Sequence, residues 1–334
     1  MASLEVSPNS SAIDGESAAP ARPRVGAGAL SVLATPLNFL ILRALSERPL
    51  RLAELRKETG LPAQTTLRGH LSSLGEVGLV AKRPTRQMPY AVENELTPAG
   101  EELLRVAVRL EVWLGTAPDG PISLESGAAK GAVKALVDGW GSTMMRALAA
   151  QPLSLTELDS KISGLSYPAL ERRLSSMRIA GLVQAQESAG AGTPYAVTEW
   201  GRRGIAPLAA AGYCESKHMG SSSAPVAPID IEAAFLLATP LAGLPAGTTG
   251  SCQLEVEPGP GGVAQAAGIQ ALVEDGKVVA CVSRLEPSPG AYAVGSAPTW
   301  FNAVAVGETR QLRFGGSRRL AEDLVQGLHS AFAR

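Results

Sequence analysis

The sequence is poor in aromatic side chains, which make up only 4% of its 334 residues. Because 45% of the residues are nevertheless hydrophobic, enough apolar material remains for sizeable cores. These cores must be built mainly from Leu, Val, Ala and Ile, the other residue types that are often buried. The length of the chain predicts two or three domains.

An excess of charge of one sign is also lacking, since 30 basic and 31 acidic side chains leave a net charge of −1. Any attraction to nucleic acid or to an anionic membrane must therefore be local. The three cysteines are odd in number and lack zinc-ligand spacing, which argues against a disulfide framework and a metal site. The sequence shows no signal peptide and no bilayer-spanning run, so we expect a cytoplasmic protein.

Stretches rich in Pro, Gly, Ser and Ala divide the chain into blocks. Residues 1–25 show no hydrophobic periodicity and are predicted to be a disordered tail. Two further stretches, "TAPDGPISLESG" at 116–127 and "GSSSAPVAP" at 220–228, are interpreted as linkers. The predicted domains span 26–118, 128–218 and 229–334.

The first two blocks contain an internal repeat. A shift of 103 residues aligns 41–80 with 144–183 without a gap, and 15 of these 40 positions are identical. The stretch "LRGHLSSLGEVGLV" in the first copy thus corresponds to "LERRLSSMRIAGLV" in the second. With about 90 residues, the repeat has the size of a small domain that is used twice.

Each copy predicts the same order of elements, namely three helices, a two-stranded hairpin and a last helix. The third helix has Leu67, Leu71 and Leu74 at a spacing that turns one apolar stripe to a core. Its counterpart carries Leu170, Leu174 and Met177. The other predicted helices lie at 37–45 and 143–149, at 52–59 and 155–162, and at 98–113 and 201–213.

Several stretches of the first copy have a familiar pattern: "LRALSERPLRLAELRKETG", "LRGHLSSLGEVGLVAKR" and "PYAVENELTPAGEELL". The second copy has "GWGSTMMRALAAQPLSLTEL", but departs from the pattern after the hairpin, where "VTEWG" replaces "LTPAG". These stretches resemble the HxlR group of bacterial winged-helix transcription regulators, relatives of the MarR type. The resemblance implies two all-α-dominated winged helix-turn-helix domains with β-wings that bind double-stranded DNA, the third helix of each entering the major groove.

Polar residues on the outer face of each third helix and in the wings are the candidate DNA contacts. Gln and Arg can read base edges bidentately, while basic wing residues can neutralise phosphates. A solvated surface position is the alternative for each of them. The candidates are Gln64, Thr65, Arg68, Ser72, Lys82, Arg83 and Arg86 in the first copy and Ser166, Tyr167, Arg172 and Arg173 in the second.

The two copies differ in their wings. The second wing, "QAQESAGAGTP", has no basic residue, so it either grips DNA more weakly or has exchanged DNA for protein or ligand contacts. Because one chain contains two copies of the domain, it supplies both halves of a twofold dimer, and each half is present at high effective concentration for the other. The sequence leaves open whether the protein is a pseudo-twofold monomer or a homodimer.

The third block predicts an α+β sheet domain, with helices at 230–238, 299–304 and 318–332 and a hairpin at "EDGK". Seven basic and ten acidic side chains give it a net charge of −3, which argues against DNA binding. Its order of elements, from "VEDGKVVACVSRLE" to "RRLAEDLVQGL", resembles the sterol-carrier-protein lipid-binding fold, which implies a cavity for an apolar small molecule. The candidate ligand contacts, for which core packing is the alternative, are Phe235, Cys281, Trp300, Phe301 and Phe314.

No catalytic constellation is found in the sequence, so neither an enzyme nor a cofactor is expected. The three histidines are far apart, and "GPGG" lacks the Lys and Ser or Thr of a phosphate-binding loop. The sequence therefore predicts a transcription regulator whose third domain senses an apolar small molecule. The alternative is a small-molecule binding or sequestering protein whose winged helices serve as a scaffold or a protein-interaction surface.

Overall fold

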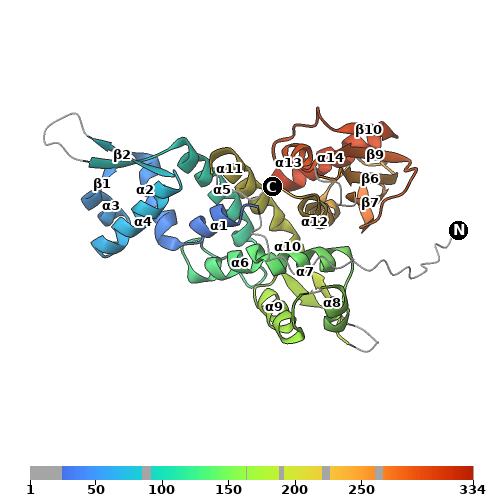
Figure 1. Cartoon of the computed structure of the whole chain (residues 1–334), viewed down its shortest axis with the longest axis horizontal. Coiled ribbons are helices and arrows are strands. Elements are labelled where there is room, and N and C mark those ends of the chain that lie inside the picture. The colour runs from blue at the N-terminus through green and yellow to red at the C-terminus, as the bar shows by residue number, and fades with distance from the viewer. Residues whose placement is uncertain are drawn as a thin grey trace.

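The computed structural model describes residues 25–84, 92–162, 164–187, 192–219, 226–259 and 266–333. Two largely helical lobes, blue and green in Figure 1, lie beside a sheet domain drawn in orange and red. Apart from Val25, the tail predicted for residues 1–25 lies outside the described residues. We call α1 to α5 the first repeat, α6 to α11 the second repeat, and α12 to α14 the sheet domain.

The first repeat consists of five helices and a small antiparallel sheet of strand order β1-β3-β2. Helix α5 begins at Pro98, where a residue without an N–H is tolerated, and Thr97 caps it by accepting the N–H of Gly100 at 3.2 Å. The elements are α1 (Ala27–Leu33), α2 (Pro36–Glu47), β1 (Leu50–Arg51), α3 (Leu52–Glu58), α4 (Gln64–Glu76), β2 (Val80–Pro84), β3 (Val92–Leu96) and α5 (Pro98–Gly115).

The second repeat has the same order of elements. Its helices α7, α8 and α9 begin and end 103 residues after α2, α3 and α4, the same offset that aligns the two sequences. Leu153 pairs with Tyr195 where Leu50 pairs with Asn94 in the first repeat. The elements are α6 (Gly127–Val137), α7 (Gly139–Ala150), α8 (Leu155–Lys161), α9 (Tyr167–Ile179), β4 (Val183–Ala185), β5 (Tyr195–Val197), α10 (Glu199–Arg203) and α11 (Ile205–His218).

The same close backbone approach closes both repeats. Gly100 lies in the first turn of α5 and Gly201 in α10. A Cβ at Gly100 would overlap the carbonyl oxygen of Leu79, and a Cβ at Gly201 would overlap that of Leu182. In each repeat the helix after the wing can therefore pack against the start of the wing only because its first turn carries a glycine.

The structure differs from the sequence prediction at the edges of the repeats. Helices α1 and α6 were not predicted, and the last helix of the second repeat, predicted as 201–213, is divided into α10 and α11. Pro207 explains the division, because it has no N–H to donate and its ring crowds the carbonyl of Arg203. The predicted linker at 116–127 is packed, with Leu124 buried and the N–H of Ile122 bonded to Leu114.

The sheet domain is a five-stranded sheet of order β10-β9-β6-β7-β8, in which only β6 and β9 pair in parallel. The predicted hairpin is confirmed: Asp275 and Gly276 join β7 to β8, both at positive φ, as a tight turn between twisted strands requires. The elements are α12 (Pro228–Ala238), η1 (Thr239–Leu241), β6 (Gly250–Val256), β7 (Ala267–Glu274), β8 (Lys277–Val282), β9 (Ala291–Gly295), α13 (Ala297–Val306), β10 (Arg313–Gly316) and α14 (Arg318–Ala333).

The two repeats meet where α5 packs against α10 and α11. The indoles of Trp113 and Trp200 stack with centroids 4.3 Å apart and planes 7° from parallel. Each indole also donates to the backbone of the other residue, Trp113 Nε1 to Trp200 O at 2.9 Å and Trp200 Nε1 to Trp113 O at 2.8 Å. Both tryptophans are buried, so this double hydrogen bond fixes the ends of α5 and α10 in one position.

A buried carboxylate makes the second link between the repeats. Glu215 of α11 accepts the N–H groups of Gly26 and Ala29, both at 2.7 Å, at the start of α1. A negative charge is favoured at this end of a helix, where the first N–H groups have no partner within the helix. The cap of a helix in the first repeat therefore comes from the second repeat.

Helices α1 and α2 are also relevant to membrane insertion. Among the described helices, none is by itself long and apolar enough to cross a membrane, and α1 with α2 meets the criteria of length and composition only as a pair bent by 82°.

The sheet domain is held to both repeats by arginines. Arg202 of α10 donates to Leu236 O at 2.7 Å and to Ala149 O at 3.4 Å, at the C-terminal ends of α12 and α7. Arg146 of α7 pairs with the buried Glu232 of α12 at 3.0 Å. On the first repeat, Arg109 of α5 reaches Phe332 O at 3.4 Å. Positive groups are stabilised at the carbonyl ends of helices, which accounts for the placement of Arg202 and Arg109.

We expect Gly100→Ala and Gly201→Ala to lower the free energy of unfolding by similar amounts, about 1–3 kcal/mol each, because each added methyl group overlaps a carbonyl oxygen. The measurement is urea unfolding of the full chain. Gly131→Ala in α6 is the matched control, since no atom lies within 4 Å of its added Cβ; it should stabilise by about 0.5–1 kcal/mol. If Gly201→Ala behaves like this control, the second repeat is not closed in the way described.

We expect Trp113→Phe and Trp200→Phe each to destabilise the chain by about 1–3 kcal/mol, because each removes a buried hydrogen bond and disrupts the stacked indole pair. Val108→Ala on the exposed side of α5 should change stability by less than about 0.5 kcal/mol. Near-ultraviolet circular dichroism provides a second measurement, since either replacement must abolish the same signal of the stacked pair. Independent, unequal signals would contradict the reciprocal contact.

Candidate nucleic-acid interface

Helix α4 has one buried and one exposed face, as its sequence predicts. Leu67, Leu71 and Leu74 are buried in the core of the first repeat. The outer face carries the exposed candidates Gln64, Thr65, Arg68 and Ser72. Gln64 and Thr65 lie in the first turn of the helix, the part that reaches base edges in a helix-turn-helix.

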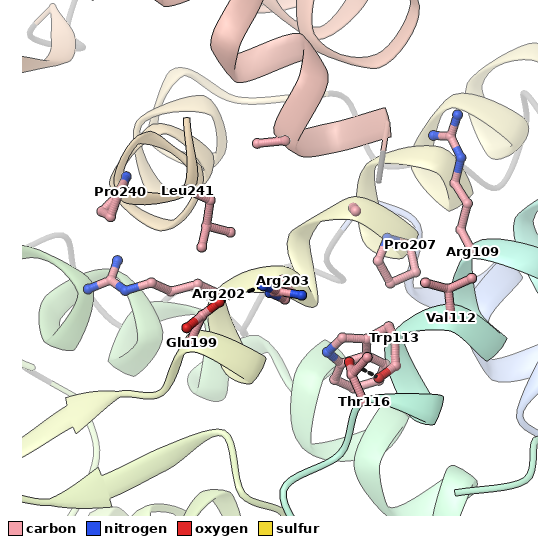
Figure 2. A pocket seen from close by; sticks show the side chains of 12 residues that line it. Arg109, Val112, Trp113, Thr116, Glu199, Arg202, Arg203, Pro207, Pro240 and Leu241 are labelled. Carbon is pink, nitrogen blue, oxygen red and sulfur yellow. Dashed lines mark hydrogen bonds and ion pairs between the residues drawn. The ribbon is translucent and has the colours of Figure 1, made fainter. Parts of the chain in front are cut away.

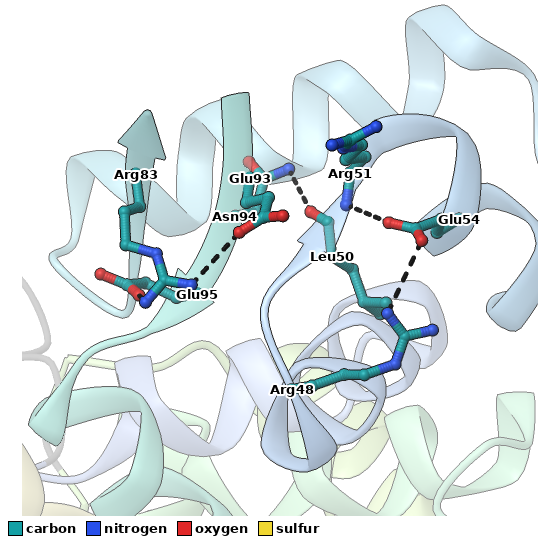
Figure 3. A network of polar contacts seen from close by, with 8 residues as sticks. All are labelled: Arg48, Leu50, Arg51, Glu54, Arg83, Glu93, Asn94 and Glu95. Carbon is teal, nitrogen blue, oxygen red and sulfur yellow. Dashed lines mark hydrogen bonds and ion pairs between the residues drawn. The ribbon is translucent and has the colours of Figure 1, made fainter. Parts of the chain in front are cut away.

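The wing of the first repeat places Lys82 and Arg83 on β2. In the ladder with β3, Lys82 lies opposite Asn94 and Arg83 opposite Glu93. Arg83 forms ion pairs with Glu93 at 3.2 Å and with Glu95 at 3.3 Å, as Figure 3 shows. Part of its charge is therefore already neutralised within the wing, whereas the exposed Lys82 has no ion-pair partner among the described residues. Arg86, the third basic candidate, lies outside the described residues.

A polar network ties this wing to the helices. Asn94 is buried and donates to Leu50 O at 3.3 Å, which joins β3 to the short strand before α3 (Figure 3). Glu54 in turn accepts the N–H of Arg51 at 2.8 Å, and this backbone hydrogen bond lowers the pKa of its carboxyl group. These polar contacts hold the wing and α3 in a fixed relative position.

Helix α9 of the second repeat is built on the same plan but carries a different surface. Ser166, Tyr167 and Arg172 are exposed, while Leu170, Leu174 and Met177 form the buried stripe. Arg173 is only partly exposed and pairs with Asp138 at the end of α6, so it is the weakest of the four candidates. In the described part of the second wing, residues 183–187 and 195–197, no side chain is basic.

Three of the five ligand candidates of the sheet domain, Phe235, Trp300 and Phe301, are buried. Phe235 and Trp300 are fully buried and pack edge to face with centroids 4.7 Å apart. The Trp300 indole donates to Glu255 O at 2.7 Å, and the Phe301 ring lies against Gly212 of α11. Their described contacts are those of core packing and docking, the alternative that the sequence had left open.

Cys281 and Phe314 are partly exposed and complete the set of candidates. Burial raises the pKa of the Cys281 thiol to about 12, so it is protonated at neutral pH. Burial likewise raises the pKa of Cys214 to about 11 and that of Cys252 to about 12. No group of His, Cys, Asp and Glu side chains suited to a metal ion occurs among the described residues.

A cavity of about 520 Å³ lies elsewhere, at the junction of the two repeats and the sheet domain. Figure 2 shows its walls, which come from α5, α10, α11 and η1, with α14 above them. Sequence reasoning missed it because its lining residues, such as Arg109, Arg202 and Leu241, are far apart in the chain and belong to no motif.

Comparison with known proteins bears on the first repeat. A model of the HxlR-like helix-turn-helix family matches residues 32–119, and no curated protein was found to match the chain. The matched residues contain α2 to α5 and both described strands of the wing. The resemblance inferred from the first copy is thereby confirmed: residues 32–119 are similar to the winged helix-turn-helix of DNA-binding transcription regulators of the HxlR type.

Proposed function

We propose that the chain is a non-catalytic, cytoplasmic transcription regulator in which two winged helices act as a covalent pseudo-dimer on one operator. The observation that carries this proposal is the 103-residue offset, which relates the bounds of three helices in one repeat to those in the other. The family match of residues 32–119 supports DNA binding by the first repeat. The shared offset extends the same role to α9 as a second recognition helix.

The joint between the repeats supports the pseudo-dimer. A twofold dimer reads two half-sites only if its recognition helices are held at a fixed separation. Here α4 and α9 belong to lobes that are connected through α5, α10 and α11, with the reciprocal Trp113–Trp200 contact at the centre. A rigid joint of this kind fixes the separation within one chain.

The two halves are proposed to contribute unequally. The first repeat offers Arg68 and Lys82 as exposed cations, while the second offers Arg172 on its helix and no basic residue in the described wing. We propose that the first repeat provides most of the affinity for phosphates and the second mainly adds sequence preference. An operator with two different half-sites follows from this division.

The alternative, a small-molecule binding or sequestering protein, draws on the sheet domain. Its strand order, with a meander β6–β8 followed by β9, α13, β10 and a last helix, supports the likeness to the sterol-carrier-protein fold. Because the aromatic candidates are packed in its core, we propose sensing through the junction with the repeats rather than through a tunnel within the sheet domain.

Salt dependence tests the DNA-facing wing. We expect Lys82→Ala to flatten the slope of log K against log salt by about one, since one phosphate contact is lost. Arg83→Ala should flatten it by less, because Glu93 and Glu95 already neutralise part of its charge. Binding of the full chain to a mixed-sequence duplex is measured, with Lys277→Ala in the sheet domain as the charge-matched control. A Lys82→Ala slope equal to that of this control would remove the wing from the interface.

Stoichiometry tests the pseudo-dimer. We expect sedimentation of the full chain with an operator duplex selected from random sequences to show one chain per duplex, because both half-site readers belong to the same chain. Scrambling either half of the selected site should weaken binding. A complex that always contains two chains would overturn the covalent pseudo-dimer, and the absence of any selected duplex would favour the sequestering alternative.

A further inference from the structure

The junction cavity is walled by all three parts of the chain. The first repeat contributes Arg109, Val112 and Trp113 from α5, and the second contributes α10 and the start of α11. The sheet domain contributes Leu241 of η1 and Ala331 of α14 (Figure 2). A ligand in this space would therefore touch both repeats and the sheet domain at once.

Positive charge predominates around the cavity. Its lining contains Arg109, Arg202 and Arg203 but only one carboxylate, Glu199, which pairs with Arg203. Arg202 is bonded to backbone carbonyls and has no carboxylate partner among the described ion pairs, and its burial lowers the pKa of the guanidinium. The hydrogen bond of Arg109 to Phe332 O is long, at 3.4 Å. The cavity thus holds cations whose charge the protein itself compensates only in part.

The remaining wall is largely apolar. Val112 is 54% exposed on the outer face of α5, and both it and Trp113 line the cavity. Leu241 faces the same space from the other side (Figure 2). A volume of about 520 Å³ is within the range of small-molecule sites, which are mostly apolar with a few charged groups that fix the orientation of the ligand.

We propose that this cavity binds a small organic anion with one carboxylate and an apolar body, and that its occupancy regulates DNA binding. The carboxylate pairs chiefly with Arg203, because its ion pair with Glu199 is more than half exposed on both sides and such exposed pairs are weak; the apolar body covers Val112 and Leu241. The regulatory part rests on the proposed function. Because the ligand touches α5 and α10, it favours one relative position of the two repeats over others, and DNA affinity changes by the ratio of its affinities for these positions.

The test uses the full chain and decanoate, a ten-carbon carboxylate, with decanol as its uncharged counterpart, in isothermal titration calorimetry. Arg203→Gln should weaken decanoate binding by at least about tenfold, as expected when a charge-assisted contact is lost. Val112→Glu should do the same by placing a like charge in the cavity. Each variant has a matched control on α5 outside the cavity. Arg105→Gln is the control for Arg203→Gln, since Arg105 is likewise paired with a glutamate. Val108→Glu is the control for Val112→Glu, since Val108 is 60% exposed.

We expect one decanoate per chain, weaker binding of decanol, parent-like affinity in both control variants, and a change of about fivefold or more in the DNA affinity of the parent chain. Absence of decanoate binding, equal loss in lining and control variants, or equal affinity for decanol would overturn the site. Specific decanoate binding without a change in DNA affinity would overturn its regulatory role alone. If the chain bound no DNA under any condition, the proposed function would fail while the calorimetry still decided the site.

Discussion

The stacked pair of Trp113 and Trp200 is the contact on which the arrangement of the two repeats depends. Each indole N–H has the other residue's carbonyl as its partner, so displacing either ring leaves a buried indole N–H without its acceptor and breaks the stack. Both residues lie at ends of helices, one near the end of α5 and the other at the start of α10. Each of the two carbonyls also accepts a backbone N–H, from Thr116 at 3.1 Å and from Gly204 at 3.2 Å, so the indole of the other residue adds a second donor to it.

The sheet domain is attached by a different kind of interaction. Arg202 of the second repeat donates to a backbone carbonyl of α12, and Arg146 of the second repeat pairs with the buried carboxylate of Glu232. These hydrogen bonds and this ion pair depend on direction and on charge. A change in the charge near them therefore alters the position of the sheet domain relative to the second repeat. A chain whose total charge is nearly neutral can in this way concentrate positive charge at an internal junction while its sheet domain carries a net negative charge.

Local patterns and the internal repeat predicted structure correctly. Neighbours within a few residues determine the stripe of Leu67, Leu71 and Leu74 and the Asp-Gly turn. The offset of 103 residues was visible because the sequence contains a second copy of the first repeat. The division at Gly204 was missed, although Pro207 could have indicated it. Arg202, Glu215 and Glu232 could not be assigned, because what gives them a role is a partner in another segment that no local pattern names.

The capping of α1 by Glu215 has a consequence for the order in which the protein is made. Synthesis proceeds from the N-terminus at about 5–20 residues per second, and Ala29 precedes its acceptor by 186 residues. For about 10–40 seconds the first repeat exists without the residue that completes its first helix. The first N–H groups of α1 therefore stay uncapped in a nascent chain until α11 leaves the ribosome, and during that interval only Glu215 of another, completed chain can cap them.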